Sequence, residues 1–560
     1  MKMLFTLVSH VLICLLFLQC GKNDGGSFQP APPAPPPSNF TISSSSINGI
    51  SSQTIYFDIN RNPSVRLSFP EKINRNTIAG SITLNDFSGS SVNYNINYEN
   101  SDSVLLLKPS QPLNYLNRYT VTVTGQLKSV NGGSLNGPSK ITFQTSIDSS
   151  GKFPLITDDA LLTLVQKQTF KYFWDLAHPV SGLARERNNS GDVVTSGGSG
   201  FGIMAIVAGI ERNFITRAQG LSRMQNIVNF LKNTAQKFHG AFPHWLNGAT
   251  GAVIPFSIKD NGADLVETSY LVQGLITARQ YFNNSNTAET NLQNDINAIY
   301  NAVEWNWFRK NDENVLYWHW SPNYNWDMNH KIQGWNECLI TYVLAASPGI
   351  YTIPKSVYDN GWATNGGIRN NNFYYNIQLP LGPSLGGPLF FAHYSFLGIN
   401  PNGLTDTYAN YSTQNINHTR INYSYTKANP KQYFGYSDSV WGLTASDIAG
   451  GYTASSPTND VGVIAPTAAL SSFPYTPVES MQALKFFYYV LGDKIWKDYG
   501  FVDAFSLHDL WFADSFLAID QGPVIIMIEN YRTGLLWNLF TSAPEVKAGL
   551  QKLGFTAPYL

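Results

Sequence analysis

The stretch Gly262-Ala-Asp-Leu-Val-Glu-Thr-Ser-Tyr270 places two carboxylates, Asp264 and Glu267, three residues apart at the start of an apolar segment. At this spacing the two side chains project from one face of a helix, one turn apart. Asp264 has the side chain and the position of a helix cap. Glu267 belongs to the helix itself, because apolar residues follow it at helical spacing; the alternative is a charge beside the positive end of the helix dipole. The stretch therefore predicts a helix that carries an acid.

Four more acids are candidates for the same pocket: Glu186, Glu337, Asp447 and Glu479. Glycoside hydrolysis needs one protonated acid at the leaving oxygen and a second carboxylate that activates water or attacks the sugar. We predict Glu267 and Asp447 as this pair, with Glu267 as general acid, although the sequence leaves open which carboxylate takes which role. The other acids, with Asp264, are expected to bind substrate. The alternatives are a turn residue for Asp447 and pairing with its flanking arginines for Glu186.

Aromatic side chains that could stack on sugar rings are concentrated in the C-terminal part of the chain. All 13 tryptophans lie at or beyond Trp174. Sugar rings stack their apolar faces on aromatic rings, while side-chain amides hold the hydroxyls. The segment 317–335 is rich in Trp, His and Asn and is typical of a pocket loop, whereas each tryptophan alone could equally belong to the core. The predicted stacking residues are Trp320, Trp326, Trp335 and Trp441.

The composition of the 560 residues favours a neutral polar ligand. Charged residues make up 13%, aromatic residues 14%, and the net charge is −1. This balance gives no electrostatic case for a nucleic acid or for an anionic membrane surface. The glycine-rich run at 197–202 lacks the lysine of a phosphate-binding loop, and no Cys/His spacing is typical of zinc. We therefore predict neither a metal nor a cofactor, and a glycan as the partner.

The first 20 residues have the pattern of a targeting signal. Lys2 precedes an apolar run from Leu4 to Leu18, which is too short for a typical membrane span, and Cys20 ends it. This pattern predicts a lipoprotein signal with Cys20 as the lipidated residue; the alternative is an ordinary secretory signal. We expect an exported protein, a periplasmic or cell-surface lipoprotein of a Gram-negative bacterium, that meets the membrane only through its lipid. Cys338 is then left without a partner for a disulfide.

The rest of the chain divides into three parts. Residues 21–38 are a linker rich in Pro and Gly. Residues 39–147 hold short alternating segments separated by turn signals and predict a β-sandwich of about seven strands that serves as a spacer. This part resembles bacterial immunoglobulin-like domains, most clearly over 117–125. The expected strands are 54–58, 64–69, 92–96, 103–107, 119–123 and 140–143.

Residues 155–560 read as helices separated by long loops rich in Gly, Pro, Asn and aromatic residues. The first helix is expected to begin at Thr157 or Asp158 and to continue to Trp174. Paired helices that ring a pocket built by loops at one end form an (α/α) toroid, so the fold class is mainly α with a small all-β domain. The further helical segments are expected at 200–214, 218–237, 264–282, 290–308, 334–346, 386–397, 405–428, 466–496 and 522–552.

Six motifs in the same order resemble glycoside hydrolase family 144, the bacterial glucoamylase-like β-1,2-glucanases. They are Asp264-Leu-Val-Glu-Thr-Ser269, Gly334-Trp-Asn-Glu-Cys-Leu-Ile340, Pro388-Leu-Phe-Phe391, Trp441-Gly-Leu-Thr-Ala-Ser-Asp447, Ile464-Ala-Pro-Thr-Ala-Ala469, and Asp520-Gln-Gly-Pro523 with Ile528-Glu-Asn-Tyr-Arg-Thr-Gly534. The resemblance covers about 155–560. It implies an (α/α)6-barrel and an inverting hydrolase that releases sophorose or short sophorooligosaccharides. It also implies Glu267 and Asp447 as the central acids, with Glu186 and Glu337 among the pocket acids.

Two other functions compete with hydrolysis. A non-catalytic, glycan-binding surface lipoprotein would bind oligosaccharides without turnover. A polysaccharide lyase on the same toroid would need a cationic site for an acidic sugar, which the net charge does not favour. Within the hydrolase interpretation, the sequence leaves endo and exo action open, because fold alone does not determine substrate or mode of attack.

Overall fold

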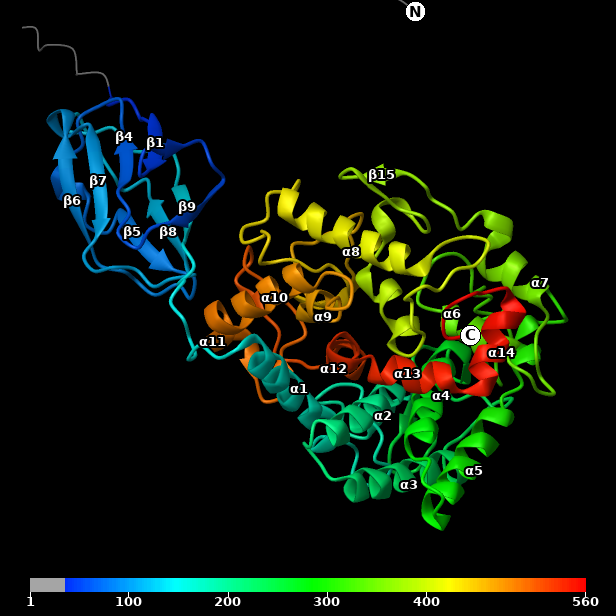
Figure 1. The fold of residues 1–560 in the computed structure, drawn as a ribbon. Coiled ribbons are helices and arrows are strands. Elements are labelled where there is room, and N and C mark those ends of the chain that lie inside the picture. The colour runs from blue at the N-terminus through cyan, green and yellow to red at the C-terminus, as the bar shows by residue number, and fades with distance from the viewer. Residues whose placement is uncertain (1–35) are drawn as a thin grey trace, which may run out of the picture.

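The computed structural model describes residues 36–560 and contains an N-terminal sandwich followed by a mainly helical domain (Figure 1). Each part has its own hydrophobic core. The fold class expected from the sequence is confirmed at this level. The predicted signal and the Cys20 site lie outside the described residues. Among the described residues, no helix combines the length and the apolar character that a membrane crossing requires.

The sandwich consists of two sheets with the strand orders β2-β1-β4-β7-β6 and β3-β9-β8-β5. Strands β3 and β9 pair in parallel, and the other neighbours pair antiparallel. Inward residues alternate with outward ones, as in β8, where Tyr119, Val121 and Val123 are buried. The strands are β1 (Ser44–Ile47), β2 (Ile50–Ser51), β3 (Ile55–Ile59), β4 (Val65–Ser68), β5 (Ile82–Asp86), β6 (Tyr94–Glu99), β7 (Val104–Pro109), β8 (Arg118–Val123) and β9 (Ser139–Thr145).

The helical domain begins with α1, which Thr157 caps through its side chain, as the sequence indicates. The helices are α1 (Asp158–Trp174), α2 (Ser196–Glu211), α3 (Arg217–Asn233), α4 (Leu265–Tyr281), α5 (Thr287–Asn301), α6 (Leu339–Ala346), α7 (Lys355–Val357), α8 (Tyr411–Ala428), α9 (Pro466–Leu470), α10 (Pro477–Lys485), α11 (Gly492–Ile495), α12 (Ala518–Thr533), α13 (Leu535–Ser542) and α14 (Pro544–Leu553).

Short two- to four-residue strands stiffen the long loops between these helices. They are β10 (Val193–Thr195), β11 (Trp245–Asn247), β12 (Val253–Ile254), β13 (Ala263–Asp264), β14 (His319–Trp320), β15 (Phe373–Tyr374), β16 (Ile377–Gln378), β17 (Ala445–Ile448), β18 (Gly451–Ala454), β19 (Trp496–Lys497), β20 (Gly500–Phe501), β21 (Phe505–Ser506) and β22 (Trp511–Phe512).

Helix α2 packs against both α4 and α12 at the centre of the helical domain. Helices α2 and α12 are buried along almost their whole length, and α4 is buried until its last turn. The backbones of α2 and α4 meet closely, because a Cβ at Gly200 would overlap the backbone of Tyr270. Helices α1, α3 and α5 keep an exposed face and cover this centre.

Four expected helical segments are broken in the structure. Segment 290–308 contains the end of α5 and the separate 3-10 turn η3 (Trp305–Arg309). Segment 386–397 forms no α-helix but the 3-10 turns η7 (Leu389–Ala392) and η8 (Tyr394–Leu397), since Gly386 and Gly387 take positive φ angles. Segment 466–496 contains α9, α10, the π-turn η9 (Phe486–Val490) and α11. Segment 522–552 belongs to α12, α13 and α14, because left-handed Gly534 ends α12 and Pro544 begins α14.

The two ends of the central helices have different roles. The first turns of α2 and α4 meet where Gly197 N–H donates to Glu267 (2.7 Å). At the other end, Arg212 after α2 forms two hydrogen bonds with Glu529 near the end of α12 (2.7 and 2.8 Å). A helix of this length spans about 24 Å. Glu267, the predicted general acid, therefore lies at the end of α2 opposite to the Arg212–Glu529 pair.

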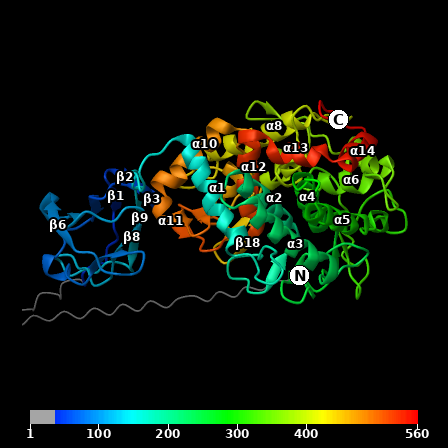
Figure 2. The ribbon, with the colours of Figure 1, turned by 60° about the horizontal axis from the view of Figure 1, so that its bottom comes forward.

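The sandwich lies beside α10 and α11 in both views (Figure 1, Figure 2). The connection between the domains is docked rather than free. Lys152 N–H donates to Tyr489 O (2.7 Å), and the ring of Phe153 stacks on Tyr488 with a centroid distance of 4.6 Å.

Candidate active site

Asp264 is the N-cap of α4 and is completely buried. Its Oδ1 accepts hydrogen bonds from Val266 N–H (3.0 Å) and Glu267 N–H (2.9 Å). Its Oδ2 lies 3.0 Å from His244 Nδ1. Burial alone would raise its pKa, but the His244 contact and the remaining hydrogen bonds lower the pKa of Asp264. Both oxygens are occupied by the protein, so Asp264 acts as a cap and a counter-ion within the site.

Glu267 has one oxygen held by the protein and one oxygen without a hydrogen-bond partner among the described residues. Its Oε2 accepts from Gly197 N–H (2.7 Å) and Thr195 Oγ1 (3.2 Å). The residue is only 3% exposed. Burial raises the pKa of Glu267 and the charge on Asp264 adds to the rise, whereas the His244 charge opposes it. Because the donors occupy Oε2, a proton held by this carboxyl belongs on Oε1.

His244, Asp260 and His319 surround these two acids. Burial alone would lower the pKa of His244, but Glu267 and Asp264 raise it to about 9, so this imidazole is a cation at neutral pH. Burial lowers the pKa of His319 to about 4, and burial with the Asp264 charge raises the pKa of Asp260 to about 7. Ligand atoms of His244, Asp260 and Asp264 lie within 4.8 Å of one another, close enough for a cation.

The aromatic segment predicted to line the pocket lies beside Asp264. Strand β14 pairs antiparallel with β13, which places His319 opposite Asp264 and Trp320 opposite Ala263. Trp320 and Trp326 are partly exposed, and the rings of both lie near Trp307, with centroid distances of 6.5 and 6.3 Å. The pairing of two short strands therefore brings part of the tryptophan cluster to the acids.

Glu337, predicted as a pocket acid, lies two residues before the start of α6, and its carboxylate has no hydrogen bond to another described residue. Burial raises the pKa of Glu337 to about 7, and the charges of Glu267 and Asp264 contribute to the rise. Its carbonyl oxygen is held by Tyr270 Oη (3.4 Å) and Ser395 Oγ. Glu337 therefore joins Glu267 and Asp260 as an acid of this group with a raised pKa.

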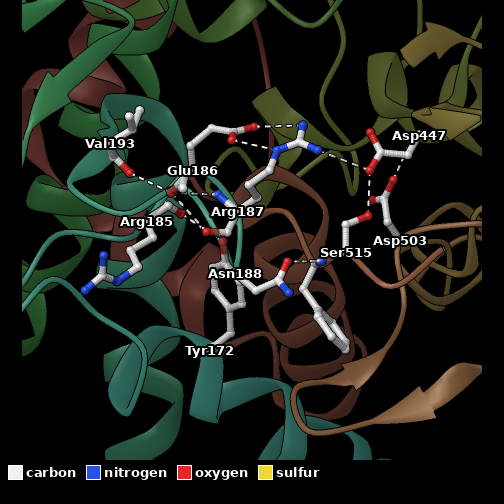
Figure 3. Close-up of polar contacts among 11 residues, drawn as sticks. Tyr172, Arg185, Glu186, Arg187, Asn188, Val193, Asp447, Asp503 and Ser515 are labelled. Atoms are coloured by element: carbon white, nitrogen blue, oxygen red, sulfur yellow. Dashed lines mark hydrogen bonds and ion pairs between the residues drawn. The ribbon is translucent and has the colours of Figure 1, made fainter. Parts of the chain in front are cut away.

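A second group of acids centres on Asp447, as Figure 3 shows. The Arg187 guanidinium joins Glu186 (Nε to Oε2, 2.8 Å) to Asp447 (Nη1 to Oδ2, 3.3 Å). Ser515 Oγ donates to the same Asp447 oxygen at 2.5 Å. Asp447 Oδ1 has no hydrogen-bond partner among the described residues and is available to a water or a sugar. The alternative predicted for Glu186, pairing with an arginine, is present, and it places Glu186 next to Asp447.

Two buried acids lie behind Asp447. The Asp447 N–H donates to Asp503 Oδ2 at 2.7 Å. Burial raises the pKa of Asp503 to about 7, and burial together with Asp503 raises the pKa of Asp520 well above its usual value. Asp503 Oδ1 and Asp520 Oδ2 are buried without a partner in the described structure. A proton shared between the two carboxyls accounts for both observations.

One short segment connects the two groups of acids. Glu186 N–H donates to Val193 O (3.0 Å), and Thr195, two residues further on, donates to Glu267. Tyr394 is buried, and burial raises its pKa, with charges from both groups, those of Asp520, Glu337 and Glu267, adding to the rise. The structure therefore brings the predicted pair, Glu267 and Asp447, to one end of the helical domain.

Three predicted contact residues do not face the site. Trp441 is 0% exposed and donates from Nε1 to Glu479 O (3.2 Å), so it is a core residue. Trp335 is also buried, between Trp362 and other aromatic rings. Glu479 lies in the first turn of α10, whose neighbouring residues line a hollow with Arg212, at the end of α2 remote from Glu267. The prediction of Glu479 as a pocket acid is therefore wrong, because α10 starts at the other end of the domain.

Sequence reasoning missed Asp503, His244, Tyr452 and Phe256. Asp503 lies in the apolar run Phe501-Val-Asp-Ala-Phe505, and an acid in such a run is the one signal that could have indicated it. Tyr452 lies opposite Asp447 in the β17–β18 pair, and Phe256 stacks on His244 at 4.2 Å. Both rings are 50% exposed. Their positions depend on strand pairing and have no local signal.

Two family models match parts of this chain. Residues 329–544 match the family model described as "Putative glucoamylase", and residues 42–145 match the Bacterial Ig-like domain model. The chain is 48% identical over 427 residues to an exo β-1,2-glucooligosaccharide sophorohydrolase (non-reducing end) from Parabacteroides distasonis. This match covers 72% of the chain and 59% of the relative, so the chain spans less than two thirds of that protein.

Two solved structures are also similar. One is an endo-β-1,2-glucanase from Chitinophaga pinensis in complex with sophorotriose and glucose, with a TM-score of 0.71 and 53% identity over 72% of this chain and 100% of that chain. The other is a β-1,2-glucanase from Parabacteroides distasonis, with a TM-score of 0.70 and 38% identity over 92% of this chain and 73% of that chain.

Proposed function

The chain belongs to the glucoamylase-like family, as its motifs predict, and from this premise we propose that it is a glycoside hydrolase that cleaves β-1,2-glucan. The observation that carries the proposal is the state of Glu267. One oxygen is fixed by an amide and a hydroxyl, the other is free, and burial raises the pKa of the carboxyl. This is the arrangement that a general acid requires.

In the proposed reaction, Glu267 is the general acid and Asp447 is the general base. The proton on Glu267 Oε1 moves to the glycosidic oxygen as the bond from that oxygen to the anomeric carbon breaks. Asp447 Oδ1 accepts a proton from the water that attacks the anomeric carbon, and inversion follows if water enters from the opposite face. Arg187 and Ser515, which hold Asp447 Oδ2, support its negative charge.

The substrate contacts follow from the exposed groups around the two acids. We assign Trp320 and Trp326 to stacking on glucose rings, because both are partly exposed on the segment beside Asp264. Glu337 and Glu186 are assigned to the hydroxyl groups, since both lie next to a catalytic acid in the described structure. Asp264 acts indirectly through His244 and the first turn of α4.

The arrangement of helices supports an (α/α)6-barrel as the finer description of the helical domain. Helices α2, α4, α6 and α12 and the turns η7 and η8 are buried, which suits an inner ring. Helices α1, α3, α5 and α14 keep exposed faces, which suits an outer ring. Loops at one end of such a ring would form the pocket, in keeping with the position of Glu267.

Digestion of linear β-1,2-glucan by the purified protein tests the function, with β-1,3-, β-1,4- and α-1,4-glucans as controls. We expect cleavage of the β-1,2-glucan alone. A ladder of sophorooligosaccharides shows endo action, whereas sophorose as the first and only product shows exo action. Measurable binding of β-1,2-glucan without release of any product would overturn the hydrolase and favour the glycan-binding alternative.

We also propose that the protein is an exported lipoprotein anchored through Cys20. The support is the sequence pattern of residues 1–20. Metabolic labelling with a radioactive fatty acid tests this proposal: the wild-type protein is expected to carry label in the membrane fraction, and Cys20→Ala is expected to lose it. Equal labelling of both proteins would contradict it.

A further inference from the structure

The sandwich holds the turn of a hairpin in the helical domain. Gln144, in β9, is fully buried, and its Nε2 donates to Leu507 O at 2.7 Å. Arg118, at the start of β8, donates from Nη2 to Gln144 Oε1 (3.0 Å) and also to His508 O. Two successive carbonyls in the turn between β21 and β22 are therefore bound by side chains of the other domain.

Aromatic rings close the same contact. Phe57 of β3 stacks on Phe434 with a centroid distance of 5.3 Å and an interplanar angle of 14°. The same ring lies 4.6 Å from the His508 ring. His508 Nδ1 accepts a hydrogen bond from Phe434 N–H (3.1 Å), and burial lowers the pKa of His508. Gly435 packs against Leu507, where a Cβ would lie 2.5 Å from the Leu507 side chain. The turn is thus enclosed by both domains.

The hairpin comprises residues 503–515, and its open end, opposite the turn that the sandwich contacts, holds Asp447. Its arms are joined by the β21–β22 pair, by Ala513 N–H to Ala504 O (2.9 Å), and by Asp503 N–H to Ser515 O (2.9 Å). At the open end, Ser515 Oγ donates to Asp447 Oδ2 (2.5 Å) and Asp503 Oδ2 accepts from Asp447 N–H (2.7 Å). A continuous chain of contacts therefore runs from the sandwich to Asp447.

We propose that the sandwich positions the general base: Gln144, with Arg118, fixes the 503–515 hairpin, and the hairpin fixes Asp447. This inference rests on the proposed function, since it takes Asp447 as the base. It gives the sandwich a role beyond that of a spacer. Gln144 and Arg118 are positioning residues, because they contact the hairpin and not the acids.

Gln144→Ala tests the proposal, because it removes the donor to Leu507 O without changing any residue of the site. We expect kcat on β-1,2-glucan to fall about tenfold, since small displacements of a catalytic group have large effects on rate. KM is expected to stay within about twofold, because the contacts around Glu267 are unchanged. The control is Arg66→Ala, which removes an ion pair with Glu99 in the other sheet and should leave both constants unchanged.

A double-mutant cycle with Ser515→Ala separates positioning from general destabilisation. If Gln144 acts through the hairpin, the loss of kcat caused by Gln144→Ala should be much smaller in the Ser515→Ala background. The proposal would be overturned if Gln144→Ala lowered kcat by the same factor in both backgrounds, or if it lowered Tm and left kcat unchanged. Should Gln144→Ala fail to fold, Phe57→Leu replaces it, because it loosens the same contact through the Phe434 and His508 rings.

Hydrogen exchange keeps this test independent of the activity. We expect amides in 503–515 and the Asp447 amide to exchange faster in Gln144→Ala than in the wild type, with unchanged exchange in α2 and α4. Unchanged exchange in the hairpin would refute the positioning role even if the wild type cleaves β-1,2-glucan. Faster exchange in a protein that cleaves no glucan would leave the mechanical link intact and reject the proposed function.

Discussion

At the residue scale, the chemistry depends on how the protein treats each carboxyl. Asp264 and Glu267 are one helical turn apart and both buried, yet their pKa values move in opposite directions. Asp264 receives two backbone N–H groups and the His244 imidazolium, which stabilise its charge. Glu267 accepts hydrogen bonds from one N–H and one hydroxyl and lies beside the charge of Asp264. Because these two donors do not offset burial, the pKa of Glu267 is raised. The raised pKa suits Glu267 to the role of a general acid, while Asp264 remains the charged partner of His244.

Glu267→Gln is expected to lower kcat about 10³-fold, because general acid catalysis contributes about 10²- to 10⁴-fold. The amide retains the acceptor for Gly197 N–H, so folding should persist. Product release from β-1,2-glucan and thermal unfolding measure the two effects. Glu337→Gln is the matched variant, since it removes the neighbouring acid, and a smaller effect on kcat is expected. The reverse order would assign the acid role to Glu337.

Asp503→Asn is expected to alter how stability depends on pH. The folded pKa of Asp503 is about 7, against an ordinary value of 3.8, so the folded protein retains a proton that the unfolded chain releases. The stabilisation is present below about pH 4 and is lost as the pH rises through 7, by at most about 1.4 kcal/mol per pH unit. Asn removes this dependence. The Tm of the variant relative to the wild type should therefore increase from pH 4 to pH 7.

The control for this pH series is Asp498→Asn, which makes the same change of side chain at an exposed position of the same domain. A constant difference in Tm between Asp503→Asn and the wild type would contradict the raised pKa of Asp503.

At the element scale, the glycines at the start of α2 allow the backbone N–H of Gly197 to reach the Glu267 carboxylate. A Cβ at Gly197 would lie 2.5 Å from Glu267 Oε2 and 2.8 Å from the Tyr270 ring. Only a residue without a side chain allows the first turn of α2 to approach Glu267 closely enough for its N–H to donate. The glycine-rich run at 197–202 is therefore a packing device that supports the acid, in agreement with its lack of phosphate-binding residues.

Gly197→Ala is expected to displace the Glu267 carboxylate and to lower kcat at least about tenfold, because a catalytic group must remain within a fraction of an ångström of its position. The overall fold should survive, since the methyl group meets a side-chain oxygen rather than backbone. Steady-state kinetics on β-1,2-glucan measures the effect. Gly349→Ala is the control, because a Cβ there meets no atom within 4 Å. Equal kcat in both variants would show that the carboxylate tolerates the methyl group.

At the scale of the whole molecule, the central helices separate catalysis from stability. Their first turns carry Glu267 and Asp520 at one end. At the other end Arg212 and Glu529 form a bidentate pair, and Gln166 Nε2 donates to Glu529 Oε2 (3.0 Å). Loops built on a rigid scaffold can then carry chemistry without weakening the scaffold.

Glu529→Gln is expected to destabilise the protein by roughly 3 kcal/mol, because removing one partner of a buried ion pair leaves the other charge without compensation. The kcat on β-1,2-glucan, measured well below Tm, should remain unchanged, since the pair lies at the end of α12 remote from Asp520. Denaturant unfolding checks the first expectation. A large loss of kcat in the folded variant would show that the two ends of the helices are coupled.

The sequence predicts a site residue well when the contacts of that residue are local, and poorly when they come from distant segments. Asp264 and Glu267 were placed together correctly because their relation is local to one helical turn. Glu479 is predicted as one more acid of the aromatic-rich domain, but α10 lies along the hollow beside Arg212, at the other end of the central helices. The one local signal of Asp503, an acid in an apolar run, does not show that this acid lies buried beside Asp447.

The sequence by itself determined the mainly helical class, the N-terminal sandwich, the family and the presence of Glu267 at the start of a helix, since periodicity, caps and ordered motifs are local properties of the chain. The tertiary structure decided which acids share the site and which of them hold protons. Those outcomes depend on burial and on charges from segments far apart in sequence, such as Asp447, Asp503 and Asp520. Electrostatic interactions act through space, so only the folded chain can set them.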